Sequence, residues 1–247
     1  MNKKVLVSVI ITTFNRAYCL KSTLQSVLDQ TVKDFEIIVV DDGSPDGTAN
    51  IVKSLQSEYF DKLHIQERTG KLGLGTAYIH GFKWALEKDY QFIFEMDADF
   101  SHDPNDLIRL YNANVLEGGD VSIGSRYVKG VNIVNWPMMR LLMSFFASKY
   151  VKIITGMPIH DSTAGFKCYK RAVLETINFD KIKFVGYAFQ IEMKFIIWKY
   201  GFNIVEVPVI FTDRTEGTSK MSGGIFFEAV LGVIQMKLKS FFRSWKR

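Results

Sequence analysis

The sequence has few of the residues that mark several structural classes. Its 247 residues include only two cysteines, Cys19 and Cys168, and five prolines. Two cysteines without any pattern of pairs predict neither a disulfide framework nor a cysteine-based zinc site, and they are typical of a reducing compartment. So few prolines argue against a linker-rich or fibrous chain. No run reaches the roughly 18–20 uninterrupted apolar residues that a transmembrane helix needs.

The chain also lacks a basic surplus outside its C-terminal end. The net charge is +5, from 31 Lys and Arg against 26 Asp and Glu. Five of the basic residues fall in residues 237–247, which contain no acidic residue, so residues 1–236 carry no net charge. A nucleic-acid-binding protein needs positive charge over its body, and this distribution therefore argues against that class.

What is present is the composition of a globular protein, with 47% hydrophobic and 23% charged residues. The length favours one α/β domain with a substantial core. Near-continuous apolar runs of strand length occupy residues 5–14, 35–42, 63–66, 91–97 and 121–125. Segments with helical periodicity alternate with them, at residues 20–30, 46–57, 75–88 and 104–117. This alternation predicts an open, mostly parallel, doubly wound sheet with helices on both faces.

The two ends of the chain need separate interpretation. The N-terminal apolar run resembles a short signal peptide, but it has no small-residue cleavage site, and we interpret it as a buried first strand. After residue 128 the alternation changes. Helical patterns cover 138–155, 170–177, 187–200 and 227–247, and a strand is expected at 204–213.

Residues that directly follow the strands are the candidates for chemistry, because open α/β sheets bind ligands beyond the carboxyl ends of their strands. Asp97 and Asp99 follow the strand at 91–97. Two carboxylates with this spacing on an extended segment point to the same side. They can hold Mg²⁺ or Mn²⁺ and leave coordination positions for diphosphate oxygens. A second acidic strand end, at Asp41 and Asp42, strengthens this interpretation, although Asp and Gly also form ordinary turns.

Glycine-rich and basic segments follow the other strands. Residues 70–75 combine three glycines with one lysine. Glycines let the backbone approach a phosphate closely, although the spacing is not that of a P-loop. Arg126 and Arg140 follow the fifth strand, and Arg214 and Lys220 follow the last one. These cations are candidates for clamping phosphates or balancing developing charge, and each alone is equally typical of a solvated surface.

Together these motifs resemble the inverting glycosyltransferase family 2, which has the GT-A nucleotide-sugar fold, and within it the polyprenyl-phosphate (dolichyl-phosphate) mannosyltransferases. The resemblance extends from about residue 5 to residue 235. It is carried by VVDDGSPDGT, RTGKLGLGTAY, EMDADFSHDP, IGSRYVKG, DSTAGFKCY, GYAFQIEM and FTDRTEGTSK. The D-x-D and DDGS motifs are shared by a very large superfamily. The S-H-x-P extension, the D-x-T-x-G-F segment and the R-x-x-G-x-S-K loop are more specific.

The resemblance implies metal-dependent, inverting transfer of a hexose from a nucleotide sugar, first of all mannose from GDP-mannose, to a polyprenyl phosphate. Asp97 and Asp99 would bind Mg²⁺ or Mn²⁺, with Ser101 as a further metal-site group. The residues implied to bind the nucleotide sugar are Thr12, Phe14, Arg16, Asp42, Lys71, Gly73, Asp97 and Ala98. The catalytic residues would be the two carboxylates together with Arg126, Arg140, Arg214 and Lys220. Asp161 and Glu192 lie in matching motifs without an assigned role.

The segment after the first strand departs from the family pattern. The family usually reads P-T-Y-N-E there, whereas this chain reads T-T-F-N-R from Thr12 to Arg16. The base of the donor therefore stays open, and the same chemistry with UDP-glucose or another nucleotide sugar is the nearest alternative. A family 2 enzyme that acts on a non-lipid glycan is a second one. A nucleotide-sugar-binding module without catalysis is a third, and the presence of both Asp97 and Asp99 argues against it.

The C-terminal segment predicts a contact with a membrane surface. Its apolar side chains recur at helical spacing on one face, at Phe227, Val230, Leu231, Ile234, Leu238, Phe241, Phe242 and Trp245. Basic side chains lie opposite or on the flank, at Lys237, Lys239, Arg243, Lys246 and Arg247. This pattern is typical of an interfacial helix attracted to anionic lipid. The Met- and Phe-rich segment 138–155 is a second candidate for that contact, and packing on the sheet is the alternative for both.

These observations predict a GT-A catalytic domain at residues 1–225 and a basic amphipathic helix at 226–247. We expect a protein bound peripherally to the cytoplasmic face of a membrane, where its acceptor would lie. A separate membrane-anchoring subunit is a candidate partner, and nucleic acid is not.

Overall fold

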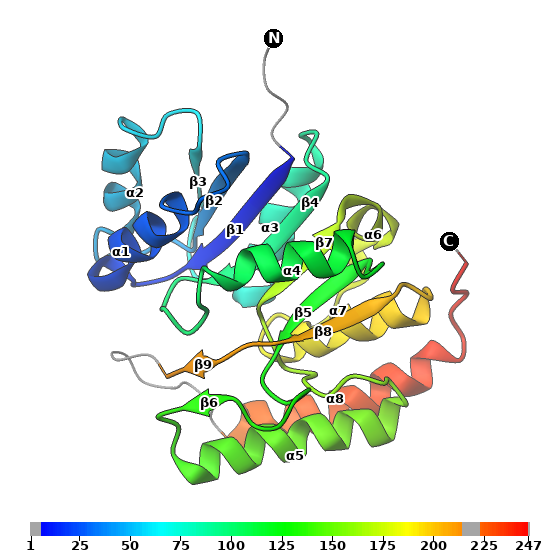
Figure 1. Ribbon diagram of the computed structural model, residues 1–247. Coiled ribbons are helices and arrows are strands. Elements are labelled where there is room, and N and C mark those ends of the chain that lie inside the picture. Colours follow the sequence, from blue (N-terminus) through cyan, green and yellow to red (C-terminus); the bar gives the residue numbers. More distant parts are fainter. Residues whose placement is uncertain (1–5, 214–222, 247) are drawn as a thin grey trace.

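The computed structural model describes residues 6–213 and 223–246, with side chains assigned from residue 230 onward in the second range. A seven-stranded sheet runs through the molecule in the order β3-β2-β1-β4-β7-β5-β8 (Figure 1). Its strands are β1 (Val7–Thr13), β2 (Phe35–Asp41), β3 (Leu63–Glu67), β4 (Phe92–Asp97), β5 (Val121–Ser125), β7 (Lys167–Lys170) and β8 (Ile204–Pro208). A small second sheet pairs β6 (Ile133–Val134) with β9 (Phe211–Thr212) in parallel.

Helices cover both faces of the large sheet. They are α1 (Ala17–Leu28), α2 (Thr48–Gln56), α3 (Leu74–Leu86), α4 (Asp106–Val115), α5 (Met138–Thr155), α6 (Arg171–Thr176), α7 (Ala188–Lys199) and α8 (Gly223–Ser240). In β1, Val9 and Ile11 pack into one core with α1, α2 and α4, whereas Ile10 packs into the other with α3, α6 and α7. Both faces of each central strand are therefore buried, which explains the continuous apolar runs in the sequence.

Helices α5 and α8 lie side by side along the lower edge of the molecule in Figure 1, beside α7. Among the described side chains, two hydrogen bonds join them. The Tyr150 hydroxyl donates to the Val230 carbonyl at 2.9 Å, and the Lys237 ammonium donates to the Thr155 carbonyl at 2.9 Å. Thr155 is the last residue of α5, so Lys237 pairs one of the carbonyls that a helix end leaves free.

The expected mostly parallel sheet is confirmed, and one strand in its middle was missed. β7 runs antiparallel between β4 and β5. Its sequence, KCYK, has no apolar run, because Lys167 faces a buried partner: its ammonium lies 2.5 Å from the Glu95 carboxylate, and both side chains are fully buried. A pattern based on hydrophobicity cannot detect a strand whose buried position holds an ion pair.

Two further expectations for the C-terminal third are wrong in detail. The strand expected at 204–213 is two strands, because β8 ends at Pro208, which has no N–H for the ladder. The final helix ends at Ser240 and does not continue to residue 247. After it, Trp245 turns back: its indole N–H donates to the Ser240 carbonyl at 2.9 Å and its ring contacts Tyr200 and Phe195 edge-on. Trp245 is therefore not part of the outer apolar face.

Candidate active site

Asp97, at the end of β4, is held from two sides. The Tyr78 hydroxyl of α3 donates to its Oδ1 at 2.9 Å, and its backbone N–H donates to Nδ1 of His102 at 3.1 Å. Burial lowers the pKa of His102, which favours the neutral ring. Because Nδ1 accepts the Asp97 N–H, the proton of the neutral ring lies on Nε2. The carboxylate itself stays 35% exposed and faces a cavity. It is a fixed anion with an accessible oxygen.

Asp99 and Ser101 lie directly after it. The Ser101 hydroxyl donates to Oδ1 of Asp99 at 2.7 Å. Both residues line the same cavity as Asp97. Two carboxylates and a hydroxyl form a hard-oxygen set of the kind that Mg²⁺ and Mn²⁺ prefer. In residues 6–213 and 223–246 no group of three or more His, Cys, Asp or Glu side chains surrounds one metal position. Asp97, Asp99 and Ser101 would fill only part of a coordination shell and would leave positions for phosphate oxygens and water.

The loops after β1 and β2 are tied together. The Asn15 backbone N–H donates to the Ser44 hydroxyl at 2.9 Å, and the Arg16 N–H donates to the Thr48 hydroxyl at 3.0 Å. Asn15 has a positive φ of 54°, which turns the chain sharply at this point. The T-T-F-N-R segment is thus fixed against the DDGSPDGT segment.

The loop after β3 packs against the loop after β2. Gly43 has a φ of 71°, and a Cβ there would lie 2.9 Å from the Cα of Gly70, so only glycine permits this approach. The Asp42 carboxylate accepts a 2.5 Å bond from Arg68 and further bonds from the backbone of Leu72 and Gly73. Burial raises the pKa of Asp42, and the Arg68 guanidinium opposes that shift. Arg68, which the sequence interpretation missed, fixes Asp42 in place.

The remaining residues expected to bind the nucleotide lie nearby. The Lys71 ammonium sits 4.9 Å from the centre of the Phe14 ring. Thr12 is buried at the end of β1, opposite Asp97 in the sheet. The Ala98 side chain is buried in the core, and its carbonyl accepts a 2.9 Å bond from the Thr23 hydroxyl. Ala98 therefore anchors the D-x-D turn on α1.

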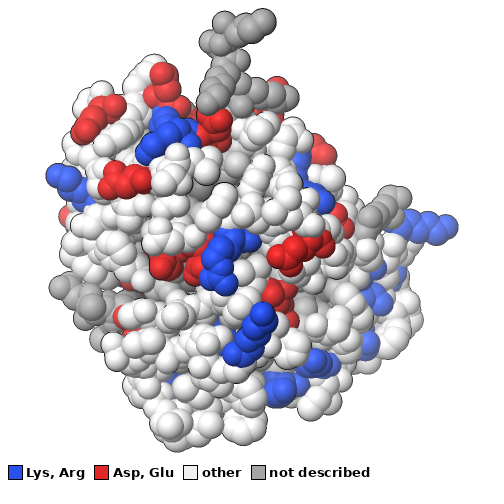
Figure 2. All heavy atoms as spheres, in the orientation of Figure 1, with Lys and Arg blue, Asp and Glu red and all other residues white. Residues whose placement is uncertain are grey.

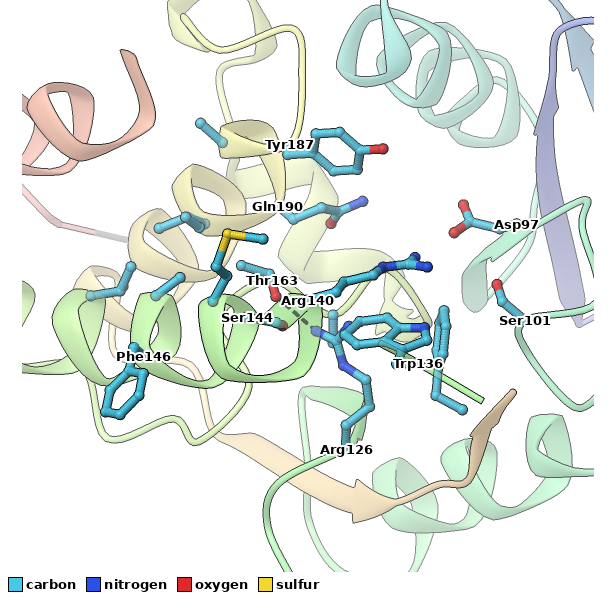
Figure 3. Close-up of a pocket in the computed structure, with 18 of the residues that line it drawn as sticks. Asp97, Ser101, Arg126, Trp136, Arg140, Ser144, Phe146, Thr163, Tyr187 and Gln190 are labelled. Carbon is cyan, nitrogen blue, oxygen red and sulfur yellow. Dashed lines mark hydrogen bonds between the residues drawn. The ribbon is translucent and has the colours of Figure 1, made fainter. Parts of the chain in front are cut away.

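Arg126 is buried in an ion pair. Its Nε and Nη2 donate to the two Asp161 oxygens at 2.7 and 2.6 Å, and Nη2 also donates to the Thr163 hydroxyl at 2.7 Å (Figure 3). The rings of Trp136 and Phe211 lie 5.3 and 5.4 Å from its guanidinium carbon. Since Asp161 engages the guanidinium with both oxygens, Arg126 mainly shapes the cavity wall.

Arg140, from the first turn of α5, is less fully engaged. Its Nη1 donates to both Asp213 oxygens at 2.7 and 2.8 Å, and its guanidinium carbon lies 4.1 Å from the Trp136 ring centre. Figure 3 shows the guanidinium extending toward Asp97 and Ser101. Within the described ranges, Nη2 and Nε of Arg140 have no hydrogen-bond partner. Arg140 can therefore donate to an anion in the cavity.

One cavity of about 680 Å³ joins these polar groups to an apolar channel. Its polar end holds Asp97, Asp99, Ser101, Arg126 and Arg140. The channel runs among α5, α7 and α8, and Phe146 marks its far side in Figure 3. The apolar side chains that line it are Leu74, Met139, Leu142, Met143, Phe146, Ala147, Val151, Ile191, Val230 and Val233.

A buried lysine that the sequence interpretation missed fixes one wall of this cavity. Lys194 of α7 donates to the carbonyls of Ser162 and Ala164 at 2.9 and 2.6 Å. Burial lowers its pKa well below the usual range. In the sequence, Lys194 stands out as a lysine within the otherwise apolar run MKFIIW, a pattern that indicates a buried lysine. Glu192, on the same helix, instead accepts the N–H groups of Lys183 and Phe184 outside the cavity.

Two expected site residues, Arg214 and Lys220, lie outside the described residues. Among the residues that are described, no helix is long and apolar enough to cross a membrane.

Comparison with known proteins now defines the class. The glycosyl transferase family 2 model matches residues 8–177. A polyprenol monophosphomannose synthase from Mycolicibacterium smegmatis is 46% identical over 203 residues, which are 82% of this chain and 76% of that protein. An undecaprenyl-phosphate mannosyltransferase from Micrococcus luteus is 44% identical over 229 residues, 93% of each chain. The chain belongs to glycosyltransferase family 2 and is a glycosyltransferase, which confirms the expected family.

Solved structures confirm the expected GT-A fold. A mannosyltransferase from Pyrobaculum calidifontis in complex with GDP-Man and Mn²⁺ matches with a TM-score of 0.63 at 17% identity, over 98% of this chain and 66% of that one. A glucosyl-3-phosphoglycerate synthase from Mycobacterium tuberculosis matches with a TM-score of 0.68 at 15% identity, over 97% and 80%. At these identities the likeness concerns the fold alone.

Proposed function

We propose that the protein transfers mannose from GDP-mannose to a polyprenyl phosphate at the cytoplasmic surface of a membrane, with the help of Mg²⁺ or Mn²⁺. One observation carries the proposal: the cavity joins carboxylates and arginines to an apolar channel. A polyprenyl phosphate has the same two parts, an anionic head and an apolar chain. The relatives named above are a polyprenol monophosphomannose synthase and an undecaprenyl-phosphate mannosyltransferase, which supports this acceptor class.

The polar end fits the chemistry of a transfer between two anions. Asp97, Asp99 and Ser101 would hold the metal ion, which supplies positive charge against the leaving diphosphate. An acceptor phosphate is already an anion at neutral pH, so little general-base catalysis is needed. Arg140 would receive that phosphate through the N–H groups that Asp213 leaves unused. Direct displacement at the sugar carbon inverts its configuration.

The other loops would hold the donor. The connected segments after β1, β2 and β3 present Phe14, Arg16, Asp42 and Lys71 at the carboxyl edge of the sheet, beside Asp97. Arg214 and Lys220 are proposed to hold phosphates from the loop after β9, on the sequence resemblance alone.

The outer faces of α5 and α8 fit a membrane contact. Large apolar side chains are exposed there, among them Met138 and Ile153 on α5 and Leu231 and Leu238 on α8. Phe242, just after α8, is 93% exposed. Soluble proteins rarely expose apolar side chains in such contiguous groups. Figure 2 shows a mostly uncharged lower surface over α5, with Lys and Arg side chains toward the α8 end.

A panel of donors and acceptors tests the proposal. The full chain is incubated with labelled GDP-mannose or UDP-glucose, Mg²⁺ or Mn²⁺, and either undecaprenyl phosphate or a soluble oligosaccharide. We expect label in the organic phase only with GDP-mannose, the polyprenyl phosphate and a metal ion. Label from UDP-glucose instead would support the alternative donor, which the T-T-F-N-R segment leaves open. Transfer to the oligosaccharide alone would overturn the acceptor assignment.

A further inference from the structure

A second cavity lies away from the active site and is lined by basic side chains. It has a volume of about 320 Å³ and lies between residues 180–184, α7 and the last turns of α8. None of its lining residues lines the active-site cavity. Its basic side chains are Lys181, Lys183, Lys239 and Arg243. We call it the basic pocket.

The acidic side chains of the basic pocket are already engaged. Glu192 accepts the backbone N–H groups of Lys183 and Phe184 at 2.9 and 3.0 Å. Asp180 pairs with Lys83 at 3.0 Å. Lys183 and Lys239 come from separate segments and line the same pocket, and the nearby Lys183 lowers the pKa of Lys239. In the described part of the chain neither lysine pairs with a carboxylate, so their charge is left for an anion from outside.

Arg243 completes the cationic side. Its guanidinium carbon lies 4.6 Å from the Trp245 ring centre, and Nη2 reaches the Tyr200 hydroxyl at 3.4 Å. Stacking on an aromatic face orients the guanidinium plane and leaves its edge able to donate to phosphate oxygens.

Close packing fixes the two sides of the pocket relative to each other. A Cβ at Gly232 of α8 would lie 2.5 Å from the Phe184 ring, so glycine allows α8 to rest directly on the loop that carries Lys183. Phe184, Phe195 and Met236 form the apolar floor. The backbone segments that carry Lys183 and Lys239 are therefore held side by side by the fold.

The location suggests which anion binds. Lys239 and Arg243 alternate with Leu238, Phe241 and Phe242, whose side chains are 56%, 68% and 93% exposed. If these apolar side chains enter a bilayer, the basic pocket lies at the level of the lipid headgroups. Figure 2 shows basic side chains grouped toward this end of the lower surface.

We propose that the basic pocket binds the phosphate of one anionic lipid headgroup and thereby fixes the orientation of the enzyme on the membrane. This inference rests on the membrane contact in the proposed function. It differs from a general attraction of basic residues to anionic lipid, because it assigns the effect to Lys183, Lys239 and Arg243 acting on one phosphate.

Vesicle binding of the full chain tests the pocket. Co-sedimentation is measured with phosphatidylcholine vesicles that contain or lack phosphatidylglycerol, in the absence of donor. The variant K183Q/K239Q is compared with K149Q/K246Q, which removes the same charge from residues outside the basic pocket. We expect the pocket variant to lose roughly 30-fold in binding to the anionic vesicles, at about 1 kcal/mol for each lysine. The matched control should lose clearly less, and both should bind phosphatidylcholine alone like the wild type.

Equal losses in the two variants would overturn the pocket and leave a general attraction of charges. Competition by dissolved inorganic phosphate at equal ionic strength would show that the pocket serves a free anion, which also contradicts the lipid assignment. Transfer to undecaprenyl phosphate in detergent should be unchanged in the pocket variant. If the wild type shows no such transfer, the proposed function fails, whatever the vesicles show.

Discussion

Asp97 and Asp99 are the two side chains on which the proposed chemistry depends most. Tyr78 and His102 fix Asp97 from the core side, whereas Asp99 is held by the neighbouring Ser101 hydroxyl. Both carboxylates line the active-site cavity, where a metal ion could reach them. The spacing D-x-D predicted this pair directly from the sequence.

Removing either carboxylate should abolish sugar transfer and leave the fold intact. For D97A and D99A we expect kcat/KM to fall by about 10³-fold or more, because the charge on the leaving diphosphate would no longer be balanced. The control D61A removes an exposed carboxylate far from the cavity and should keep full activity. Circular dichroism and thermal unfolding check the fold, and activity retained in either site variant would contradict the metal assignment.

The buried pair of Asp161 and Arg126 makes stability depend on pH. Burial alone would raise the pKa of Asp161, but the Arg126 guanidinium lowers it below the ordinary value of 3.8. The unfolded chain therefore takes up the proton first as the pH falls. The stabilisation is complete above the unfolded pKa, at about pH 5 and higher, and is lost as the pH drops through the lowered folded pKa.

The variant D161N tests this dependence. It leaves a buried Arg126 without its counter-charge, and we expect its free energy of unfolding to be about 3–5 kcal/mol lower than the wild type near neutral pH. The difference should shrink as the pH falls toward about 3. D180N, whose carboxylate is exposed and pairs with exposed Lys83, should change stability little at any pH. A difference for D161N that is independent of pH would contradict the ionised pair.

At the scale of elements, the sequence predicted most of the central sheet and few of the contacts that close the site. Continuous apolar runs identified β1 to β5, because strands buried on both faces are apolar at every position. The hydrophobic pattern did not show β7, because its buried Lys167 is polar and pairs with Glu95 of the neighbouring β4. It also did not show that Asp213 meets Arg140 across 73 residues, since such pairings depend on the assembled fold.

The contact between α8 and the loop before α7 gives an element-scale prediction. Because a Cβ at Gly232 would overlap the Phe184 ring, G232A should force the helix and loop apart. We expect a loss of about 1–3 kcal/mol in the free energy of unfolding, measured by denaturant titration. The control is G186A, where a Cβ meets no atom within 4 Å. An unchanged midpoint for G232A would show that α8 does not pack as described.

For the whole molecule, the main feature is that α5 and α8 serve both the cavity and the outer surface. Their inner faces supply Val151 and Val233 to the core and the channel wall. Their outer faces carry exposed apolar side chains. Such helices would bring the cavity close to the lipid phase from which the acceptor comes. The sequence predicted an apolar face on the C-terminal segment, but not that Trp245 would leave it to pack on Tyr200.

Membrane binding should depend on these exposed side chains. In L238D/F242D two apolar side chains, 56% and 93% exposed, become acidic. We expect binding to phosphatidylcholine vesicles to fall at least about tenfold, because each buried apolar side chain contributes roughly 1.5–3 kcal/mol. L116D alters a side chain that is 75% exposed and lies outside α5 and α8, so it should bind like the wild type. Equal binding by all three proteins would contradict the assigned membrane face.

The central claim is that the channel accepts the chain of a polyprenyl phosphate while the polar end acts on its phosphate. The most direct measurement is kcat/KM for mannose transfer from GDP-mannose in detergent, with undecaprenyl phosphate and with a phosphate that carries one isoprene unit. The test compares the wild type with A147W, which places a large ring in the channel. We predict a strong preference of the wild type for the long acceptor, and loss of that preference in A147W with the short acceptor still used. Equal use of both acceptors by the wild type would contradict the account.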